Sequence, residues 1–596
     1  MSGWAPTTFP WRRPRHELLL LALIACVAFV PVYRAGDQDL SRLCLTQALV
    51  HGHLSNDVCL TPSFDKAFFG GHLYSDKAPG LSVAAVPAVG ALQLRPVNQI
   101  HGSDLRLWGV WLLTSGIAFL LGAFLVGRIG EGLAPGRGGA VLVAFGIGTI
   151  FAPLAATSFG HVTAATLALG AFALAWRRQP LLAGLVAGGA LLVEYQTAAI
   201  LVILGVYVAL RGTRALGRYA AGVLPGVALL LTYDALAFGS PWHLSYRYVA
   251  IKQQSSGFFG IGLPHLHSTY LVLAGSSGLL LISPVLVAAV YGLVLLAPTH
   301  RVEAIVCGVV AAFFLLLNCG YYAPYGGTLV GPRFFVPALP FLALGLGPAF
   351  ARRPRVTRAL TVLSVLPVVG LTIVWSQNPP LHQTIWGELV RLPSEGRDSR
   401  LMRHMTDTVF KWISAGSGWG FAVIVVAAAA ALALALPTRP WALRRDARHH
   451  PWQAGAIAVA AIALLTATEY VAARPTVLST SISATTSAAF PGEEVDFTVT
   501  VVNETGKYLP HAVLMIKLPP GMQLLGRPTF ERGHGCTGTS TLACGLSFLE
   551  AHMTTRVHVG VRIAPGTASD AKVTAWGLAG EAVGPKTSFT VAIGSA

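Results

Sequence analysis

Two short charged stretches follow the first apolar run of this chain. The stretch AGDQDLSR, residues 35–42, places Asp37 and Asp39 directly after that run, and GHLYSDKAPG, residues 71–80, carries Lys77 before a proline–glycine break. A carboxylate at a helix N-terminus is favoured in its ionised form by the helix dipole, so it can act as a general base on an incoming hydroxyl. The Pro79–Gly80 bend can hold the Lys77 ammonium near a bilayer surface.

The segment that begins at Asp39, DLSRLCLTQALVHG, is expected to form the helix that carries these acids. Its apolar residues Leu40, Leu43, Leu49 and Val50 fall roughly on one side of a helix. This pattern is typical of an interfacial helix that lies in the headgroup plane. The first carboxylates would then be held at membrane height.

The composition indicates a multi-span membrane protein. Hydrophobic residues make up 54% of the 596 residues and charged residues only 11%, about half the charged share of soluble domains. The net charge of +17 is explained by Lys and Arg in cytoplasmic loops rather than by nucleic-acid binding. The chain contains no P-loop or dinucleotide fingerprint.

Thirteen membrane spans are predicted from apolar runs of roughly 17 to 25 residues and some shorter ones. They cover 17–33, 106–127, 139–155, 160–176, 181–193, 197–210, 217–238, 278–297, 304–320, 334–351, 359–375, 419–436 and 454–472. The stretch 181–210 is interpreted as a hairpin of two short helices. The first run resembles a signal peptide in its basic flank, but no small-residue cleavage site follows, so it is interpreted as a retained helix.

The arginine distribution predicts the orientation of these spans. Arg12, Arg13 and Arg15 place the N-terminus inside, and the odd span count places the C-terminus outside. The loops assigned to the inside carry Arg128, Arg137, Arg177, Arg178, Arg211, Arg214, Arg218, Arg301, Arg352, Arg353, Arg355, Arg358, Arg439, Arg444, Arg445 and Arg448. The loop 34–105 is therefore expected on the outer side of the membrane. The protein as a whole is expected in the bacterial plasma membrane.

The C-terminal part, from residue 475 to 596, has a different pattern from the membrane domain 1–474. Apolar residues alternate in VDFTVTVVN, RVHVGVRI and TSFTVAIG, with turns such as PGEE and NETGK between them. This alternation predicts an extracytoplasmic β-sandwich of about seven strands. Over about 480–595 the segment resembles the immunoglobulin-like repeat domain of bacterial surface proteins, which indicates fold and not activity.

Two cysteine pairs are candidates for disulfides in an oxidising compartment. Cys536 and Cys544 flank TGTSTLA in the β-sandwich, and Cys44 and Cys59 both fall in the loop 34–105. The alternative for Cys44 and Cys59 is two unpaired buried thiols.

The order of several motifs resembles the GT-C superfamily of polyprenyl-phosphate-sugar-dependent glycosyltransferases. LYSDKAPGLSVAAVP is similar to the Lys-Pro-Pro-Leu segment of the protein mannosyltransferase and aminoarabinose transferase branch, although Ala78 and Gly80 depart from it. TYDALAFGSPWHLSY, GSSGLLLISPVL and YGGTLVGPRFFVPALPFLAL resemble later segments of bacterial members. The resemblance covers roughly 17–350 and implies an inverting transferase with a lipid-phosphate-sugar donor.

The resemblance implies roles for individual residues. Asp37 matches the catalytic Asp, and Lys77 matches the lysine that contacts the lipid phosphate; Arg333, after Gly331 and Pro332, could hold a phosphate as a fork. Asp39 makes a D-x-D pair with Asp37 that in some branches binds a divalent metal. The alternatives are a helix-capping Asp39, a snorkelling Lys77 and an interfacial anchor at Arg333.

Six further residues are weaker candidates for lining a substrate cavity. They are Tyr74, Asp76, His161, Glu194, Tyr246 and Arg247. An acid at membrane depth such as Glu194 usually marks a site, unless its turn reaches water. His161 is otherwise a turn residue, and Tyr246 with Arg247 an interfacial pair.

The function expected from the sequence is transfer of a sugar from a polyprenyl phosphate to an acceptor on the outer face. Asp37 would deprotonate the acceptor hydroxyl, and Lys77 and Arg333 would stabilise the leaving phosphate. The alternative is a transporter or a lipid- or envelope-binding protein without catalysis, which would place its polar residues at the membrane midplane. The sugar, the acceptor and any need for a metal stay open.

Overall fold

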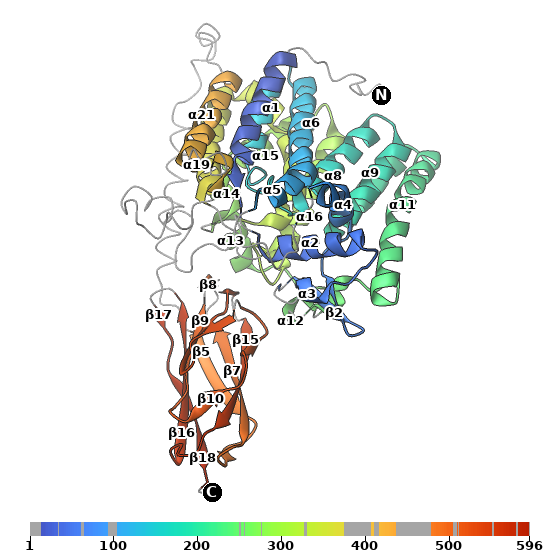
Figure 1. Cartoon of the computed structure of the whole chain (residues 1–596). Coiled ribbons are helices and arrows are strands. Elements are labelled where there is room, and N and C mark those ends of the chain that lie inside the picture. Colours follow the sequence, from blue (N-terminus) through green and yellow to red (C-terminus); the bar gives the residue numbers. More distant parts are fainter. Residues whose placement is uncertain are drawn as a thin grey trace. The chain divides into compact units, whose positions relative to one another are not determined.

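A computed structural model describes most of the chain. The described residues are 14–33, 35–60, 63, 65–92, 94, 104–249, 252–255, 257–275, 277–326, 331–374, 407–410, 417–436, 478–504, 509–510, 512–533, 535–550, 553–579 and 582–594. The chain divides into two compact units, one helical and one rich in β-strands (Figure 1). The predicted span 454–472 and the predicted domain boundary at residue 474 lie outside the described residues.

The helical unit consists of helices of very different lengths. The α-helices are α1 (Pro14–Phe29), α2 (Asp37–Val50), α3 (Asp57–Leu60), α4 (Gly80–Ala91), α5 (Leu105–Trp111), α6 (Ile117–Leu133), α7 (Gly138–Gly146), α8 (His161–Trp176), α9 (Pro180–Val193), α10 (Ala198–Ala209), α11 (Thr213–Phe238), α13 (Leu266–Ala274), α14 (Leu279–Ile282), α15 (Val285–Leu296), α16 (Arg301–Gly320), α17 (Leu339–Ala343), α18 (Leu346–Arg352), α19 (Pro354–Val374) and α21 (Ser417–Ala435). A further short helix is α12 (Lys252–Ser255). A π-helical turn η2 (Leu112–Gly116) joins α5 to α6, and 3-10 turns are η3 (Tyr195–Thr197), η4 (Ser245–Tyr248) and η5 (Arg333–Ala338).

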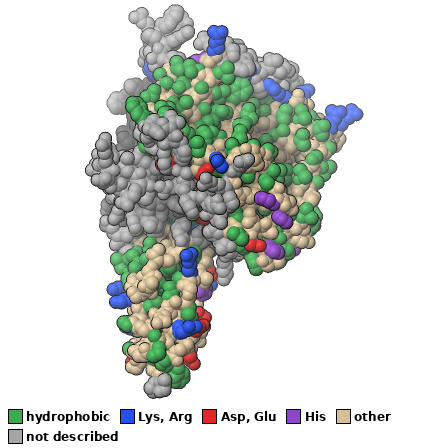
Figure 2. Space-filling model, in the orientation of Figure 1, with side chains coloured by type: hydrophobic (Ala, Val, Ile, Leu, Met, Phe, Trp, Pro, Cys, Tyr) green, Lys and Arg blue, Asp and Glu red, His purple; other side chains and the backbone are tan. Residues whose placement is uncertain are grey.

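Apolar helices confirm that this unit belongs to a membrane protein. Among the described residues, four helices are long and apolar enough to cross a bilayer, and up to six spans result if each of two bent helix pairs counts as one. Apolar side chains cover much of the visible face of the helical unit in Figure 2. The number of thirteen spans is not confirmed by this count and stays a prediction.

Several predicted spans are interrupted in the structure. The range 139–155 is helical only to Gly146, the range 278–297 is broken before Pro284, and the range 334–351 becomes η5, α17 and α18. Proline and glycine end helices, and non-helical backbone at membrane depth is tolerated where protein buries it. Residues 147–160 are indeed buried throughout. The predicted hairpin at 181–210 is present as α9 and α10, separated at Glu194 and η3.

The loop between the first two predicted spans is an ordered layer of small elements. The helix α2 is followed by α3, by the antiparallel hairpin β2 (Lys66–Phe69) and β3 (His72–Ser75), and by α4. The expected helix from Asp39 is confirmed, but its polar residues Ser41, Arg42 and Thr46 are buried. The polar side of α2 therefore faces protein rather than water.

The β unit is a sandwich of two sheets, as the alternating pattern predicted, and their strands pair antiparallel except for the parallel pair β18 and β6. One sheet has the order β10-β15-β7-β5 with β11 beside β15, and the other has β12-β13-β9-β16-β18-β6 with β17 beside β16. Strand burial alternates, for example in β7 and β16, so that each sheet turns one face to a shared core. The strands are β5 (Leu478–Ala484), β6 (Ala488–Ala489), β7 (Glu494–Asn503), β8 (Leu509–Pro510), β9 (Val513–Lys517), β10 (Met522–Leu524), β11 (Thr529–Phe530), β12 (Gly535–Thr537), β13 (Thr541–Gly545), β14 (Phe548–Leu549), β15 (Thr554–Ile563), β16 (Asp570–Ala579), β17 (Ala582–Val583) and β18 (Thr587–Ile593). In the helical unit, β1 (Pro31–Val32) pairs with β4 (Asp407–Thr408).

Candidate functional site

The N-terminus of α2 is fixed by Asp39. One carboxylate oxygen of Asp39 accepts the backbone N–H of Gly36 at 3.0 Å, and the other accepts the N–H of Ser158 at 2.9 Å. The first bond caps the helix, and the second ties it to the segment before α8. With both oxygens of Asp39 engaged in this way, the capping interpretation describes the residue better than the metal-ligand interpretation.

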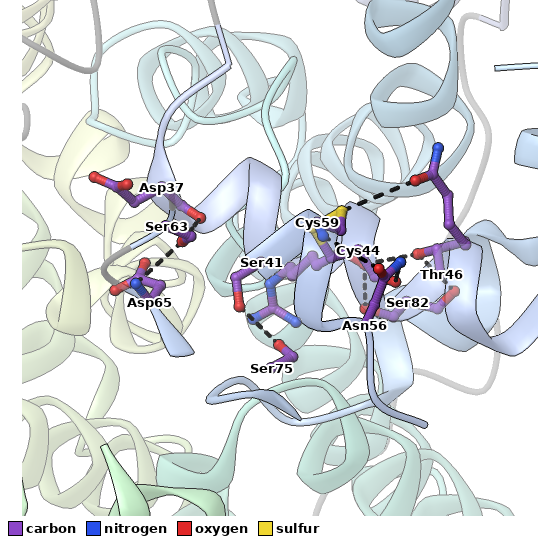
Figure 3. Close-up of a disulfide and its surroundings, with 12 residues drawn as sticks. Asp37, Ser41, Cys44, Thr46, Asn56, Cys59, Ser63, Asp65, Ser75 and Ser82 are labelled. Atoms are coloured by element: carbon purple, nitrogen blue, oxygen red, sulfur yellow. Dashed lines mark hydrogen bonds between the residues drawn. A yellow bond between two sulfur atoms is a disulfide. The ribbon is translucent and has the colours of Figure 1, made fainter. Parts of the chain in front are cut away.

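Asp37 is the first residue of α2 and is only partly buried. Its backbone oxygen accepts the Ser63 hydroxyl at 3.1 Å, and the same hydroxyl oxygen accepts the N–H of Asp65 at 3.2 Å. Figure 3 shows these three residues together, with the Asp37 carboxylate directed away from Ser63. The carboxylate of Asp37 also acts on Lys66, whose pKa is lowered by burial and raised in part by Asp37.

Lys77 lies between two carboxylates. Its ammonium is 2.8 Å from Asp76 Oδ2 and 3.3 Å from Asp65 Oδ2, and Lys77 is only 6% exposed. Burial alone would lower the pKa of Lys77, but Asp65 and Asp76 outweigh this effect and raise it. The predicted alternative of a snorkelling surface lysine therefore does not fit its buried position.

Asp76 is a buried acid next to Lys77. Burial raises the pKa of its carboxyl to about 6, against the opposing effect of Lys77 and with a further increase from Asp65. Its second oxygen lies 3.3 Å from the Ser41 hydroxyl, which also bonds Ser75 at 2.8 Å. Figure 3 shows the Ser41–Ser75 contact, which joins α2 to the end of β3.

Arg333 reaches the same region from a distant part of the chain. It is the first residue of η5. Its Nη1 donates at 3.1 Å to Oε1 of Gln38, the residue that follows Asp37. Its guanidinium lies 5.1 Å from the ring centroid of Phe159 and 5.2 Å from that of Phe334. The positive charge of Arg333 also acts on Lys77.

A second buried ion pair joins α2 to the break between α9 and α10. Arg42 Nη2 donates to Glu194 Oε1 at 2.7 Å, and neither side chain has appreciable exposure. His161 Nδ1 is 3.6 Å from the same oxygen and 3.3 Å from the Gln196 amide nitrogen. Glu194 is therefore not a solvated turn residue, and His161 is packed into the site region.

The remaining candidates divide into two groups. Tyr246 lies near the site, with its ring 5.5 Å from that of Tyr195, and it acts electrostatically on Lys77. Tyr74 instead packs its ring against Phe238 at 5.3 Å. Arg247 is exposed and is not brought into the charged cluster.

Both predicted disulfides are present. Cys44–Cys59 joins α2 to α3, and Cys536–Cys544 joins β12 to β13. The first lies within the same layer as Asp37 and Asp65 (Figure 3). This disulfide fixes the helix that carries the predicted base.

The described residues contain no group of three or more His, Cys, Asp or Glu side chains arranged to hold a metal ion. The Lys77 ammonium is paired with Asp65 and Asp76, and the Arg333 guanidinium bonds Gln38, which follows Asp37 at the N-terminus of α2. Such a set can bind a phosphate oxyanion and accept a proton from a hydroxyl.

Sequence reasoning missed three charged residues of this region. Asp65 and Lys66 follow no recognisable motif, and only the hairpin brings them to Lys77 and Asp37. Arg42 had a usable signal, because a buried acid such as Glu194 requires a nearby cation. Asp234 of α11 was also missed; it is fully buried, and neither carboxylate oxygen has a hydrogen-bond partner among the described residues.

The chain matches no protein-family model and no curated protein. Comparison with solved structures returned ArnT from Cupriavidus metallidurans, in the apo state and bound to undecaprenyl phosphate. Each of these matches has 14% identity, a TM-score of 0.40 and 71% coverage of this chain, and they cover 75% and 76% of the respective ArnT chains.

The comparison also returned the Archaeoglobus fulgidus oligosaccharyltransferase in the apo form. It has 12% identity and a TM-score of 0.36, and the match covers 74% of this chain and 59% of that enzyme. The major pilin subunit of Bacillus cereus matches 20% of this chain with 9% identity and a TM-score of 0.16. The function is inferred below from the site residues themselves.

Proposed function

We propose that the protein is a membrane glycosyltransferase that moves a sugar from a polyprenyl-phosphate donor to an acceptor on the extracytoplasmic face. One observation carries this proposal: charged residues far apart in sequence are brought into one region by hydrogen bonds and ion pairs. The Ser63 hydroxyl joins the backbone carbonyl of Asp37 to the backbone N–H of Asp65, and the Asp65 carboxylate pairs with Lys77. Arg333 bonds the residue that follows Asp37.

The proposed roles follow from the charges. Lys77 and Arg333 bind the donor phosphate, and their positive charge stabilises the phosphate as it leaves. Asp37, which is partly exposed at the start of α2, deprotonates the acceptor hydroxyl. That hydroxyl oxygen attacks the anomeric carbon, the bond from this carbon to the phosphate oxygen breaks, and inversion results because the attack is a single displacement opposite the leaving group.

The donor chemistry explains why the cluster is attached to a membrane domain. A polyprenyl tail stays in the bilayer, so the phosphate can be presented only at membrane height. The energy for transfer is already stored in the sugar–phosphate linkage, and no nucleotide site is needed. A transporter is less favoured because the linked charges gather on the layer formed by α2, the β2–β3 hairpin and the segment 75–80.

A label-transfer assay tests the proposal. The purified full-length protein is incubated with polyprenyl phosphates that carry different radiolabelled sugars, together with envelope lipids and glycans as acceptors. The expected result is loss of label from one lipid donor and its appearance in an acceptor. If no donor loses label while bound polyprenyl phosphate is detected, the protein binds the lipid without transferring a sugar, and the alternative function holds.

The proposed topology places the N-terminus in the cytoplasm and both the loop 34–105 and the β unit outside. The arginine distribution supports this arrangement. Protease added to intact spheroplasts should release the β unit as a soluble fragment. Survival of the β unit under conditions that cleave control outer loops would contradict the topology.

A further inference from the structure

Arg42 is the largest side chain that is fully buried among the described residues, with 0% exposure. A guanidinium in such a place must be paired, since an uncompensated buried charge is strongly unfavourable. None of the roles proposed above uses this residue. Its position in the middle of α2, between Asp37 and Cys44, raises the question of what the charge is for.

The contacts of Arg42 connect three separate segments. Its Nη2 donates to Glu194 at the break between α9 and α10, and its Nη1 donates to the carbonyl oxygen of Ala78 at 3.1 Å. Its own carbonyl oxygen accepts the Ser82 hydroxyl at 3.0 Å. Arg42 therefore ties α2 to both ends of the turn 78–82 and to the α9–α10 break.

A fourth segment is fitted around the same pair. A Cβ atom at Gly160 would lie 2.5 Å from Glu194 Oε1 and 2.9 Å from Arg42 Nη2. The backbone of Gly160 has an ordinary helical φ of −59°, so glycine is needed there for close approach and not for conformation. The space around the ion pair is thus closed on the side of α8.

Ala78 is the residue directly after Lys77. The ammonium end of Lys77 is held by Asp65 and Asp76, and the backbone on its C-terminal side is held by Arg42. If the Ala78 carbonyl were released, the turn before Pro79 could rotate and carry the ammonium away from its place. A displacement of about 1 Å in a binding group can reduce a reaction rate roughly 100-fold.

We propose that Arg42 and Glu194 form a positioning pair that holds the Lys77 turn in the geometry needed to bind the donor phosphate. The inference rests on the proposed role of Lys77. Arg42 acts through the Ala78 carbonyl and Glu194 fixes Arg42, so neither residue touches the donor. A pair that served only to stabilise the fold would have no reason to bond the peptide next to the phosphate-binding lysine.

Three variants of the full-length protein probe the pair. Arg42→Lys keeps the charge but replaces the two guanidinium nitrogens, which bond Ala78 and Glu194, with a single nitrogen. Arg42→Gln with Glu194→Gln removes both charges together, and Gly160→Ala inserts a methyl group between them. We expect each to weaken binding of a polyprenyl-phosphate sugar by roughly 10- to 100-fold, as loss of a charge-assisted contact does.

Two matched controls separate positioning from general damage. Arg128→Lys alters another mostly buried ion pair, with Glu17 at 3.5 Å, which among the described residues shares no contact with the Lys77 pairs. Gly308→Ala adds a methyl group in α16 where no atom lies within 4 Å. Both controls should bind the donor as the unaltered protein does, whatever happens to Tm.

The pH dependence of donor binding gives a readout that a merely structural role would not move. The Asp76 carboxyl faces Lys77 and Asp65. From α2 it meets the Ser41 hydroxyl and the charge of Arg42, and from α11 it meets Tyr233. Its backbone oxygen accepts the hydroxyl of Ser245 in η4. Burial raises the pKa of Asp76 most, and Arg42 is among the charges that lower it. Neutralising Arg42 and Glu194 should move the pH transition of donor binding upward through the lost Arg42 charge alone. Arg42→Lys keeps that charge, so an upward shift in this variant reports a Lys77 ammonium that has moved away from Asp76, whereas a purely structural pair would leave the transition in place.

A cryo-EM structure of the Arg42→Gln, Glu194→Gln variant provides the readout that does not depend on the donor. The inference predicts a displaced Lys77 ammonium that has lost its contact with Asp65 or Asp76. If Lys77 does not move, the pair is purely structural and the inference is overturned. The same holds if donor binding stays within about twofold of the unaltered protein while Tm falls. If Lys77 moves but the unaltered protein binds no polyprenyl-phosphate sugar, the positioning stands and the proposed function fails.

Discussion

Two groups of buried charged side chains in the described part of the helical unit differ in how their charges are paired. Around α6, Arg128 pairs with Glu17, and Glu131 accepts the backbone N–H groups of Gly136 and Gly138 at 2.8 and 2.9 Å. Every one of these contacts joins segments within the first 138 residues. They stabilise helix ends and a turn, as buried charges often do.

The cluster around α2 differs from this in the range of the sequence that it joins and in how its charges are paired. It brings together residues from 37 to 333, and Lys77 has two carboxylates while Arg333 is engaged by the neutral Gln38. The Nε atoms of Arg42 and Arg333 have no hydrogen-bond partner among the described residues. The comparison teaches that buried charge by itself does not indicate a site; long-range convergence with spare donors does.

The largest expected effect comes from removing the base of the α2 cluster. Asp37→Asn should slow transfer by about 10²- to 10⁴-fold, the contribution of a general base, and should leave donor binding nearly unchanged because little volume is lost. Transfer rate and donor binding are measured on the same preparation. The matched control is Asp39→Ala, which should cost about 1 kcal/mol of stability as a lost helix cap; equal losses of transfer in both variants would mean that α2 is only a structural element.

Removing the lysine should act mainly on donor binding. Lys77→Ala should weaken it by one to two decades, equivalent to about 1.5–3 kcal/mol, and should also slow transfer. Because that variant leaves Asp65 and Asp76 facing each other, Lys77→Ala combined with Asp76→Asn serves as the companion variant. Equilibrium binding of a labelled donor distinguishes the cases, and restored binding in the companion variant would argue against a direct contact between Lys77 and phosphate.

The acid beside Lys77 should make donor binding depend on pH. The pKa of Asp76 is raised to about 6 by burial. Its carboxyl therefore takes up a proton at a higher pH in the folded state than in the unfolded state. The cost of keeping this carboxylate ionised is present above pH 6 and is relieved as the pH falls toward 4. Over the same window the negative charge next to Lys77 disappears.

Binding of a phosphodiester donor should therefore tighten by roughly three- to tenfold between pH 7.5 and pH 5.5, as expected from removing one partly screened charge. Asp76→Asn should abolish this dependence. Titration of donor affinity against pH in both proteins is the measurement. A dependence that survives in Asp76→Asn would assign it to another group.

The disulfide at α2 should contribute to stability more than to chemistry. A separation of 15 residues between Cys44 and Cys59 corresponds to about 3 kcal/mol in the loop-entropy description, whereas the separation of 8 in the β unit corresponds to about 2.5 kcal/mol. Cys44→Ser with Cys59→Ser should lower Tm of the helical unit and reduce transfer only about severalfold. A complete loss of transfer without a fall in Tm would give this disulfide a functional role.

Much of this organisation was predictable from the sequence, and the limits have physical reasons. Hydropathy and strand alternation identified the membrane helices and the β-sandwich, because both depend on local periodicity. They did not reveal the breaks after Gly146 and before Pro284, since an apolar run has the same composition whether it is one helix or two. The number of spans consequently stays a prediction.

The candidate site was predictable only where a motif marked it. Asp37, Lys77 and Arg333 were named from their resemblance to known segments, and Glu194 from its acid character at membrane depth. Asp65, Lys66 and Arg42 were not, because their importance depends on contacts across the hairpin β2–β3 and the α9–α10 break. Arg247 is exposed and lies outside the charged cluster, which could not be predicted because a sequence does not show which way a side chain on a 3-10 turn points.

The most direct test of the central claim is a cryo-EM structure of the full-length protein with a non-transferable phosphonate analogue of a polyprenyl-phosphate sugar. The account predicts the phosphonate oxygens within hydrogen-bond distance of the Lys77 ammonium and the Arg333 guanidinium, and the Asp37 carboxylate facing the sugar. A phosphonate bound elsewhere, or an Asp37 carboxylate directed away from the sugar in the bound state, would contradict it.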